Sequence, residues 1–228
     1  MIRKKILNPT SSLLEGFDDV GTPDMKYYAF DWDDNIMMMP TKIIVKDEND
    51  NEVGMSTEDF AEYRSEIGVE PFDYKGSKIV GYSDEPFRNF RTGGDKQFKI
   101  DTMKGKPGPA WSDFVEAINN GSIFSIITAR GHNPEAIKDA IYNLIISDHM
   151  GINKDLLIKN LRKFRDLSNM EDKSDMELIK DYMDMNKYYP VSFGTDAGAA
   201  NPEELKVQAM KEFISYVKGQ AKEMGKKL

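Results

Sequence analysis

The chain has 228 residues, 39% of them hydrophobic and 31% charged, which is typical of a globular protein with one large domain or a core domain plus an insert. No apolar run approaches the roughly 18 residues that span a bilayer, and the basic N-terminus lacks the apolar stretch of a secretory signal, so we expect a soluble, cytoplasmic protein without a membrane partner. The absence of cysteine excludes disulfides and thiolate chemistry, and the net charge of −8 does not favour a nucleic-acid partner.

The N-terminal part of the chain predicts an arm followed by strands. Residues 1–24 are rich in proline, serine and glycine, and predict a loosely structured arm. Residues 27–30 form an apolar run that predicts the first core strand. Residues 42–45 and 52–55 flank a polar turn and therefore predict a hairpin.

The segment after this hairpin mixes helix and strand signals. Ser56 or Thr57 predicts the start of a helix to about residue 67, because acidic residues follow in the first turn. Weaker strand patterns occupy residues 78–82 and 97–100, and the Gly- and Pro-rich residues 104–109 predict a firm break.

Beyond this break, helices and strands alternate. The periodicity predicts helices at 111–118, from Pro134, at 174–185 and from Pro202, and strands at 123–127, 156–158 and 191–193. This alternation is typical of an α/β, Rossmann-like fold, a parallel sheet flanked by helices. Residues 36–106 are richer in strand and turn signals, so we expect a β-rich, cap-like insertion there and a core formed by residues 25–35 and 107–228.

Polar residues follow the apolar runs of the expected parallel sheet. They are Asp31 and Asp33 after the first strand, Thr128 and Arg130 after the second, and Asp196 after the third. Because the carboxyl ends of parallel strands meet at one edge of a sheet, these side chains are expected to converge. Two carboxylates on one face can bind a hard cation, attack an electrophile and transfer a proton.

Four segments in this order resemble the motifs of the haloacid dehalogenase-like (HAD) superfamily, over roughly residues 25–205. An apolar strand followed by Asp-x-Asp matches residues 29–33, and an apolar strand ending in Thr matches residues 126–128. A lysine near a helix start matches Lys173, with Lys159 as the alternative, and an apolar strand ending in an acidic residue matches residues 191–196. The resemblance implies phosphatase or phosphotransferase chemistry, because the second aspartate is suited to protonate an alcohol leaving group.

The resemblance also implies a role for each matched residue. Asp31 is the nucleophile that forms an aspartyl-phosphate, and Asp33 is the general acid and later the general base. Thr128 binds the transferring phosphoryl oxygens, and Lys173 neutralises developing negative charge. Asp196 binds Mg²⁺ together with a carboxylate oxygen of Asp31 and the backbone carbonyl of Asp33.

The chain departs from the family pattern in two places. Asp34 and Asn35 stand where Gly-Thr is common, and Asp34 is expected to face solvent or to lie beside the metal ligands. Residues 197–201 lack the second acidic residue that usually follows the fourth motif, so Asn201 or a water molecule is expected to complete the metal site.

Some of these residues also have ordinary structural explanations. Arg130 either clamps a substrate phosphate or lies on the surface at a helix start. His132 and His149 are expected on the surface or in loops, and only His132 near the cleft. Trp32 is expected to face away from its two aspartate neighbours, into packing.

We therefore expect a Mg²⁺-dependent phosphatase that acts on a phosphorylated small molecule or nucleotide. The insertion offers aromatic and basic candidates for substrate contacts, although an ordinary small core is the favoured explanation for them: Tyr82, Phe87, Arg88, Phe90 and Arg91. Two alternatives stay open, a nucleotide or polynucleotide-end phosphatase with a basic groove beside Asp31, and a non-catalytic HAD-like binding module. The sequence leaves the substrate and the oligomeric state open.

Overall fold

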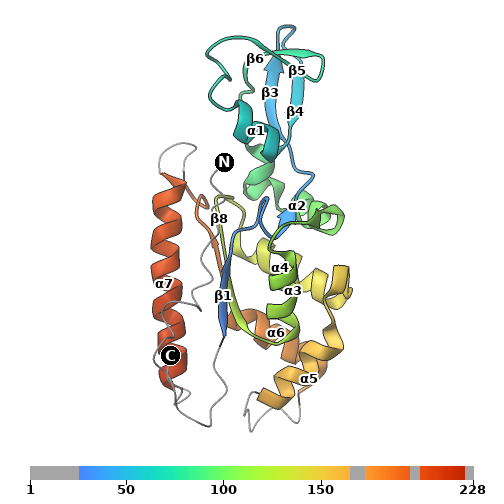
Figure 1. The fold of residues 1–228 in the computed structure, drawn as a ribbon, viewed down its shortest axis with the longest axis vertical. Coiled ribbons are helices and arrows are strands. Elements are labelled where there is room, and N and C mark those ends of the chain that lie inside the picture. Colours follow the sequence, from blue (N-terminus) through green and yellow to red (C-terminus); the bar gives the residue numbers. More distant parts are fainter. Residues whose placement is uncertain (1–25, 165–172, 196–200, 224–228) are drawn as a thin grey trace.

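A parallel three-stranded sheet forms the centre of the larger part of the molecule, in a computed structural model that describes residues 26–164, 173–195 and 201–223. Its strands, in the spatial order β1-β8-β9, are β1 (Tyr27–Phe30), β8 (Ile123–Thr128) and β9 (Lys187–Pro190). Phe30 lies opposite Ile126, and Thr128 lies opposite Pro190. The carboxyl ends of the strands therefore lie at one edge, which faces the upper part of the molecule in Figure 1.

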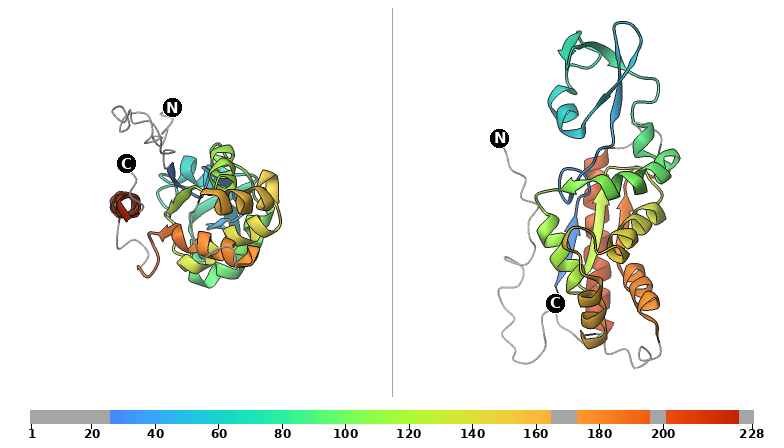
Figure 2. Two further views of the ribbon diagram at one scale, coloured as in Figure 1. Left: turned by 90° about the horizontal axis from the view of Figure 1, so that it is seen from below. Right: turned by 90° about the vertical axis from the view of Figure 1, so that its right-hand side faces the viewer.

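Helices cover both faces of this sheet. One face is covered by α3 (Trp111–Asn119), α4 (Pro134–Ile146), α5 (Lys154–Phe164) and α6 (Asp175–Met185). The long helix α7 (Pro202–Glu223) packs on the other face and stands apart from the remaining helices in Figure 2. The larger part is thus an α/β fold with a parallel sheet between helical layers.

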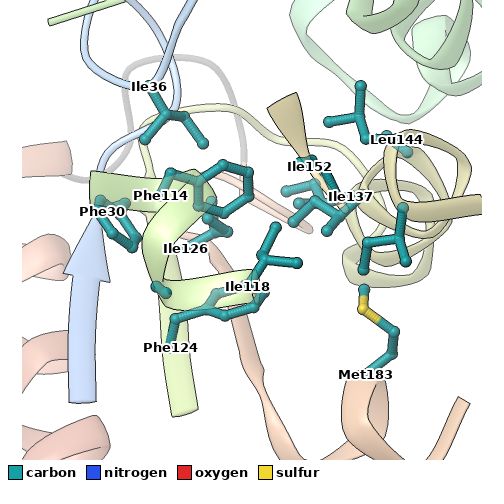
Figure 3. Close-up of a cluster of buried hydrophobic side chains, with 14 of the residues drawn as sticks. Phe30, Ile36, Phe114, Ile118, Phe124, Ile126, Ile137, Leu144, Ile152 and Met183 are labelled. Atoms are coloured by element: carbon teal, nitrogen blue, oxygen red, sulfur yellow. The ribbon is translucent and has the colours of Figure 1, made fainter. Parts of the chain in front are cut away.

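The apolar residues of the core explain this layering. Every residue of β8 is buried, as expected for a strand that is covered on both faces. On one side, Phe30, Phe114 and Ile126 belong to the main hydrophobic cluster, shown in Figure 3. On the other side, Phe213 and Val217 of α7 pack with Ile123 in a smaller cluster.

The upper part of the molecule is a separate antiparallel sheet, which we name the β3–β6 lobe (residues 43–82). Its strands, in the order β4-β3-β6-β5, are β3 (Ile43–Asp47), β4 (Glu52–Met55), β5 (Phe72–Tyr74) and β6 (Ser77–Tyr82), joined by helix α1 (Thr57–Tyr63). The lobe has its own hydrophobic cluster, which includes Val45, Met55 and Ile79.

Short elements connect the lobe with the core. They are β2 (Met37–Met38), which pairs with β7 (Lys106–Pro107), the 3-10 turns η1 (Arg88–Phe90) and η2 (Thr92–Gly94), and helix α2 (Asp95–Lys104). A further 3-10 turn, η3 (His149–Gly151), precedes α5. Because α2 packs against α4, the second half of the expected insertion belongs with the core helices rather than with the lobe.

Most elements that the sequence predicted are confirmed, including β1, the hairpin, and the helices that begin at Trp111, Pro134 and Pro202. Ser56 caps α1, which ends at Tyr63, earlier than the expected residue 67. The N-terminal arm expected at residues 1–24 lies outside the described residues. Within the described part of the chain, no helix combines the length and the apolar character that a membrane crossing requires.

Three strand predictions were wrong. Residues 97–100 belong to helix α2, where Phe98 is buried and Ile100 is 40% exposed. Residues 156–158 belong to helix α5, whose buried Leu157 and Leu161 lie four residues apart.

The third wrong prediction concerns the last strand of the core sheet, which lies earlier in the chain than residues 191–193. The strand is Lys187–Pro190, and the amide of Val191 makes the last bond to β8 by donating to the Thr128 carbonyl. A turn follows at once, in which the amide of Phe193 donates to the carbonyl of Pro190. The short strand β5 had no sequence prediction.

Candidate active site

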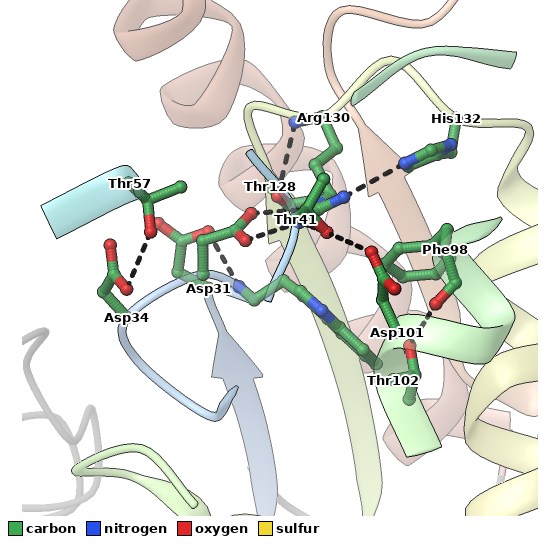
Figure 4. Close-up of polar contacts among 12 residues, drawn as sticks. Asp31, Asp34, Thr41, Thr57, Phe98, Asp101, Thr102, Thr128, Arg130 and His132 are labelled. Carbon is green, nitrogen blue, oxygen red and sulfur yellow. Dashed lines mark hydrogen bonds and ion pairs between the residues drawn. The ribbon is translucent and has the colours of Figure 1, made fainter. Parts of the chain in front are cut away.

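The loop after β1 carries Asp31, Asp33 and Asp34 at the carboxyl edge of the core sheet. Asp31 and Asp34 are labelled in Figure 4. Trp32 anchors this loop, because its side chain is fully buried and lies 5.2 Å from the ring of Phe98, as the sequence predicted. The loop also packs against Gly108, where a Cβ atom would lie 2.3 Å from the carbonyl oxygen of Asn35. Only glycine allows so close an approach of two backbones.

Asp31 is held by a backbone amide and a lysine. Its Oδ1 accepts a hydrogen bond from the amide of Trp32 at 2.8 Å, and its Oδ2 accepts one from Nζ of Lys206 at 2.7 Å. Burial raises the pKa of Asp31 above its ordinary value, while the Lys206 ammonium and the Trp32 amide oppose this rise. The Asp31 side chain is still 24% exposed, so an incoming group can reach it.

Lys206 lies on α7 and was not among the site residues that the sequence predicted. A signal was present, because Lys206 precedes the buried Ala209, Phe213 and Val217 by three, seven and eleven residues. This is the spacing of one helix face, so a lysine interrupts the inward stripe of an amphipathic helix. A charged residue at such a position usually has a partner in the interior.

Asp33 forms a bidentate ion pair with Arg130. The Arg130 Nη2 and Nε atoms donate to Asp33 Oδ1 and Oδ2 at 2.7 and 2.8 Å. The Arg130 side chain is 1% exposed, so this pair is largely shielded from water. The alternative that placed Arg130 on the surface is therefore wrong, and its guanidinium is bound to Asp33 rather than open to a substrate phosphate.

Further contacts fix the Arg130 guanidinium. It lies 4.5 Å from the ring of Phe90 and 5.0 Å from the ring of Phe98. Its Nη2 also donates to Thr41 Oγ1 at 3.3 Å, and the Thr41 hydroxyl in turn donates to Asp101 of α2 at 3.0 Å. Aromatic faces and hydrogen bonds together hold this cation in one position.

His132 completes this network between β8 and α4. Its Nε2 lies 3.1 Å from Arg130 Nη1, and its Nδ1 lies 2.8 Å from Asp95 Oδ1. Since the guanidinium can only donate, Nε2 accepts and Nδ1 carries the proton. Burial and the charge of Arg130 lower the pKa of His132, against the opposing effect of Asp95. His132 is fully buried in a loop near the site, so the loop prediction is confirmed and a surface position is wrong.

Thr128 ends β8 beside these aspartates. Its side chain is 1% exposed, and its Oγ1 accepts a hydrogen bond from the Arg130 amide at 3.3 Å. Because the hydroxyl oxygen accepts in this bond, the O–H group keeps its proton for donation, but its burial means that a substrate oxygen reaches it only after neighbouring side chains move.

Lys173 and Asp196, the other two expected site residues, are not described beside Asp31. Lys173 precedes α6, and its ammonium pairs with Asp181 of the same helix. The helix α6 lies beside the lower, amino-terminal end of the sheet in Figure 1, away from the edge that carries Asp31. Lys159 is exposed on α5, and Asp196 lies outside the described residues.

The metal site implied by the resemblance needs Asp196, which lies outside the described residues. Among the side chains that the structure describes, no three His, Asp or Glu residues are grouped to hold a metal ion. A carboxylate offers about four lone-pair sites, and the two hydrogen bonds of Asp31 leave room for a cation. The Asp31 carboxylate and the Asp33 carbonyl are oxygen donors, which suits Mg²⁺. Asn201 is described, and its side chain accepts from the Glu203 amide.

Asp34 is exposed, and its side chain also contacts the β3–β6 lobe. Its Oδ1 accepts a hydrogen bond from the hydroxyl of Thr57, the first residue of α1, at 3.0 Å. Its φ angle is +56°, a left-handed conformation that glycine adopts easily and that few other residues adopt.

The candidate substrate contacts of the insertion have partners of their own. Arg88 pairs with Glu52 through two hydrogen bonds, and Arg91 donates to the backbone carbonyl of Thr195 at 3.1 Å. Tyr82 and Phe87 pack with Phe60 of α1. The fifth candidate, Phe90, lies against the Arg130 guanidinium, and none of the five belongs to the hydrophobic cluster of the lobe, so the small-core explanation stays a prediction.

A hollow of about 280 Å³ lies between β9, the start of α4 and α7. Its lining includes Tyr189, Phe193 and Leu205 but none of the predicted site residues. The hollow is therefore separate from the carboxylates at the sheet edge.

Comparison with known proteins gives no assignment. The sequence matches no family model, and no curated protein or solved structure is similar to it. What the site can do follows from its own side chains: a lysine-bound carboxylate, an arginine-bound carboxylate and a threonine hydroxyl at one sheet edge.

Proposed function

We propose that the chain is a HAD-like, Mg²⁺-dependent phosphatase that forms an aspartyl-phosphate on Asp31, and that the β3–β6 lobe acts as its cap. One observation carries the proposal. Asp31, Asp33 and Thr128 lie at the carboxyl edge of one parallel sheet, with the Lys206 ammonium 2.7 Å from Asp31. This arrangement supports nucleophilic attack, proton transfer and charge neutralisation in one place.

In the first step, a carboxylate oxygen of Asp31 attacks the phosphorus of a phosphate monoester. The bond between phosphorus and the alcohol oxygen breaks, and Asp33 gives this oxygen a proton that it has taken up beforehand, when one of its hydrogen bonds to Arg130 opens. Lys206 takes the charge-neutralising role that the resemblance assigned to Lys173, because its ammonium already contacts Asp31. Thr128 donates to a phosphoryl oxygen.

In the second step, a water molecule attacks the phosphorus of the aspartyl-phosphate. Asp33 takes a proton from this water, the bond between phosphorus and Asp31 breaks, and inorganic phosphate leaves. Both oxygens of Asp33 accept hydrogen bonds from Arg130, so each proton transfer requires one of these bonds to open. Arg130 is in this scheme a positioning residue for Asp33.

Mg²⁺ bound by Asp31, the Asp33 carbonyl and Asp196 would reduce the repulsion between the phosphate and the carboxylates. The polynucleotide-end alternative has less support, because the basic side chains it would use, Arg88 and Arg91, are engaged with Glu52 and Thr195.

The test is hydrolysis of an aryl phosphate by the purified full chain with Mg²⁺, for the parent protein and Asp31→Asn. We expect the substitution to abolish turnover and to abolish a phosphate adduct on Asp31, detected by mass spectrometry after acid quenching. Asp113→Asn, which changes an exposed aspartate of α3, is the matched control. Unchanged turnover in Asp31→Asn would contradict the mechanism, and a parent chain with neither turnover nor adduct would favour the binding-module alternative.

A further inference from the structure

The β3–β6 lobe is attached to the core by few contacts. Its hydrophobic cluster is separate from the main cluster of the core. Within the described residues, the hydrogen bond between Thr57 and Asp34 is the only side-chain hydrogen bond that joins residues 43–82 to the loop after β1. The position of the lobe above this loop therefore depends on the two chain connections, on the contacts that Arg88 and Phe87 make with Glu52 and Phe60, and on this hydrogen bond.

The lobe side of the contact is held in place by the start of α1. Ser56 caps the helix, and its hydroxyl accepts a hydrogen bond from the Asp59 amide at 3.1 Å. Thr57 follows directly, so its backbone is fixed relative to α1 and to the packed residue Phe60.

The core side is held by a tight turn. The Asp34 amide donates to the carbonyl of Met37 at 3.0 Å, and the Met37 amide donates to the carbonyl of Trp32 at 3.1 Å. Asp34 adopts a positive φ in this turn, which costs an aspartate more than a glycine. Aspartate tolerates this conformation better than most residues, so it fits the tight turn. At Asp34 this conformation accompanies the side-chain hydrogen bond to Thr57.

We propose that Asp34 and Thr57 form a clasp that holds the β3–β6 lobe over Asp31 and thereby favours substrate binding. Asp34 and the proposed nucleophile Asp31 lie on the same loop, so a lobe held at Asp34 lies close to the phosphate subsite. Both are positioning residues, since neither touches the reacting atoms. The inference rests on the proposed function, because it assigns the clasp a role in that reaction.

The first test compares Thr57→Val, which removes the hydroxyl, with Thr57→Ser, which keeps it. A single exposed hydrogen bond is worth a factor of about 2 to 10 in an equilibrium, so we expect Thr57→Val to raise KM about 2- to 10-fold. The value of kcat should stay close to that of the parent, and Thr57→Ser should restore KM. An unchanged KM, or an equal rise in both variants, would overturn the proposal.

The second test needs no activity. Hydrogen–deuterium exchange of the full chain should become faster in Thr57→Val, both in residues 57–63 and in the loop after β1, and should match the parent in Thr57→Ser. Asp34→Gly, which keeps the positive φ and removes the acceptor, should have the same effect, and the double variant should add nothing further. Unchanged exchange in Thr57→Val would overturn the clasp.

The two tests separate this inference from the proposed function. If the parent chain shows no phosphatase activity, the proposed function fails, and the exchange measurement still decides whether the clasp holds the lobe. If turnover depends on Asp31 but neither KM nor exchange responds to Thr57→Val, the clasp fails and the phosphatase stands.

Discussion

The core sheet edge and the β3–β6 lobe hold their charged side chains in opposite ways. At the sheet edge, Arg130 is 1% exposed and donates two hydrogen bonds to Asp33. In the lobe, the ion pair of Lys78 with Glu48 has side chains that are 51% and 53% exposed. A buried charge without its partner is costly, whereas an exposed pair contributes little. Charge geometry is therefore fixed in the Asp33–Arg130 pair and adjustable in the Lys78–Glu48 pair.

Asp33→Asn is expected to have the largest effect on stability. It removes the counter-charge of the buried Arg130, and breaking such a pair lowers the free energy of unfolding by about 3 kcal/mol. This is the lower end of the usual range, which we choose because the Asp33 side chain is 20% exposed. Urea unfolding followed by circular dichroism measures the change.

The matched change in the lobe is Glu48→Gln. It removes one partner of an exposed pair, so its unfolding midpoint should stay close to that of the parent. Equal losses in the two variants would mean that burial does not distinguish the two regions.

Much of the fold was predictable because its apolar residues are spaced regularly. The continuous run at residues 123–127 and the periodic residues of α3, α4 and α7 predicted the parallel sheet and its helices. Helix α2 was missed because its buried residues include Asp101 and Thr102, which give no apolar stripe. The strand β9 was missed because Lys187 and two tyrosines resemble a surface segment more than a core strand.

The site was predictable in part. The positions of Asp31, Asp33 and Thr128 follow from the rule that parallel strands end at one edge. The pairing of Asp33 with Arg130 was not predictable, because the two residues are 97 positions apart and their contact depends on tertiary packing. Lys206 left a signal on the inward face of α7, and only its contact with Asp31 distinguishes it from Lys173.

Lys206→Met tests whether the ammonium beside Asp31 at the core sheet edge acts in catalysis. The ammonium is a charge-assisted donor to the proposed nucleophile, and loss of one such group typically lowers kcat roughly a hundredfold. Lys211→Met, which changes an exposed lysine of the same helix, is the control. A kcat for Lys206→Met equal to that of the control would remove Lys206 from the mechanism.

Lys206→Met should also shift the pH dependence of kcat/KM. Burial raises the pKa of Asp31, and Lys206 opposes that rise. Without Lys206 the pKa of Asp31 rises further, and because the attacking carboxylate must be ionised, the acid limb of kcat/KM should move to higher pH. A shift to lower pH would contradict this account of the Asp31 environment.

The smallest expected effect concerns the adjustable charges of the lobe. Residues 43–82 contain 10 acidic and 4 basic residues, a net charge of −6, and Glu58 lies directly after Thr57 of the clasp. We expect an alcohol leaving group with a second phosphate to react with a kcat/KM a few-fold lower than a neutral one, because the lobe repels it. The difference should shrink at high salt, where charges separated by more than about 8 to 10 Å are screened. The kcat/KM values of glycerol phosphate and glycerol bisphosphate, compared at two salt concentrations, measure the difference and its dependence on salt. A preference for the bisphosphate would show that fixed cations, rather than the lobe surface, select the substrate.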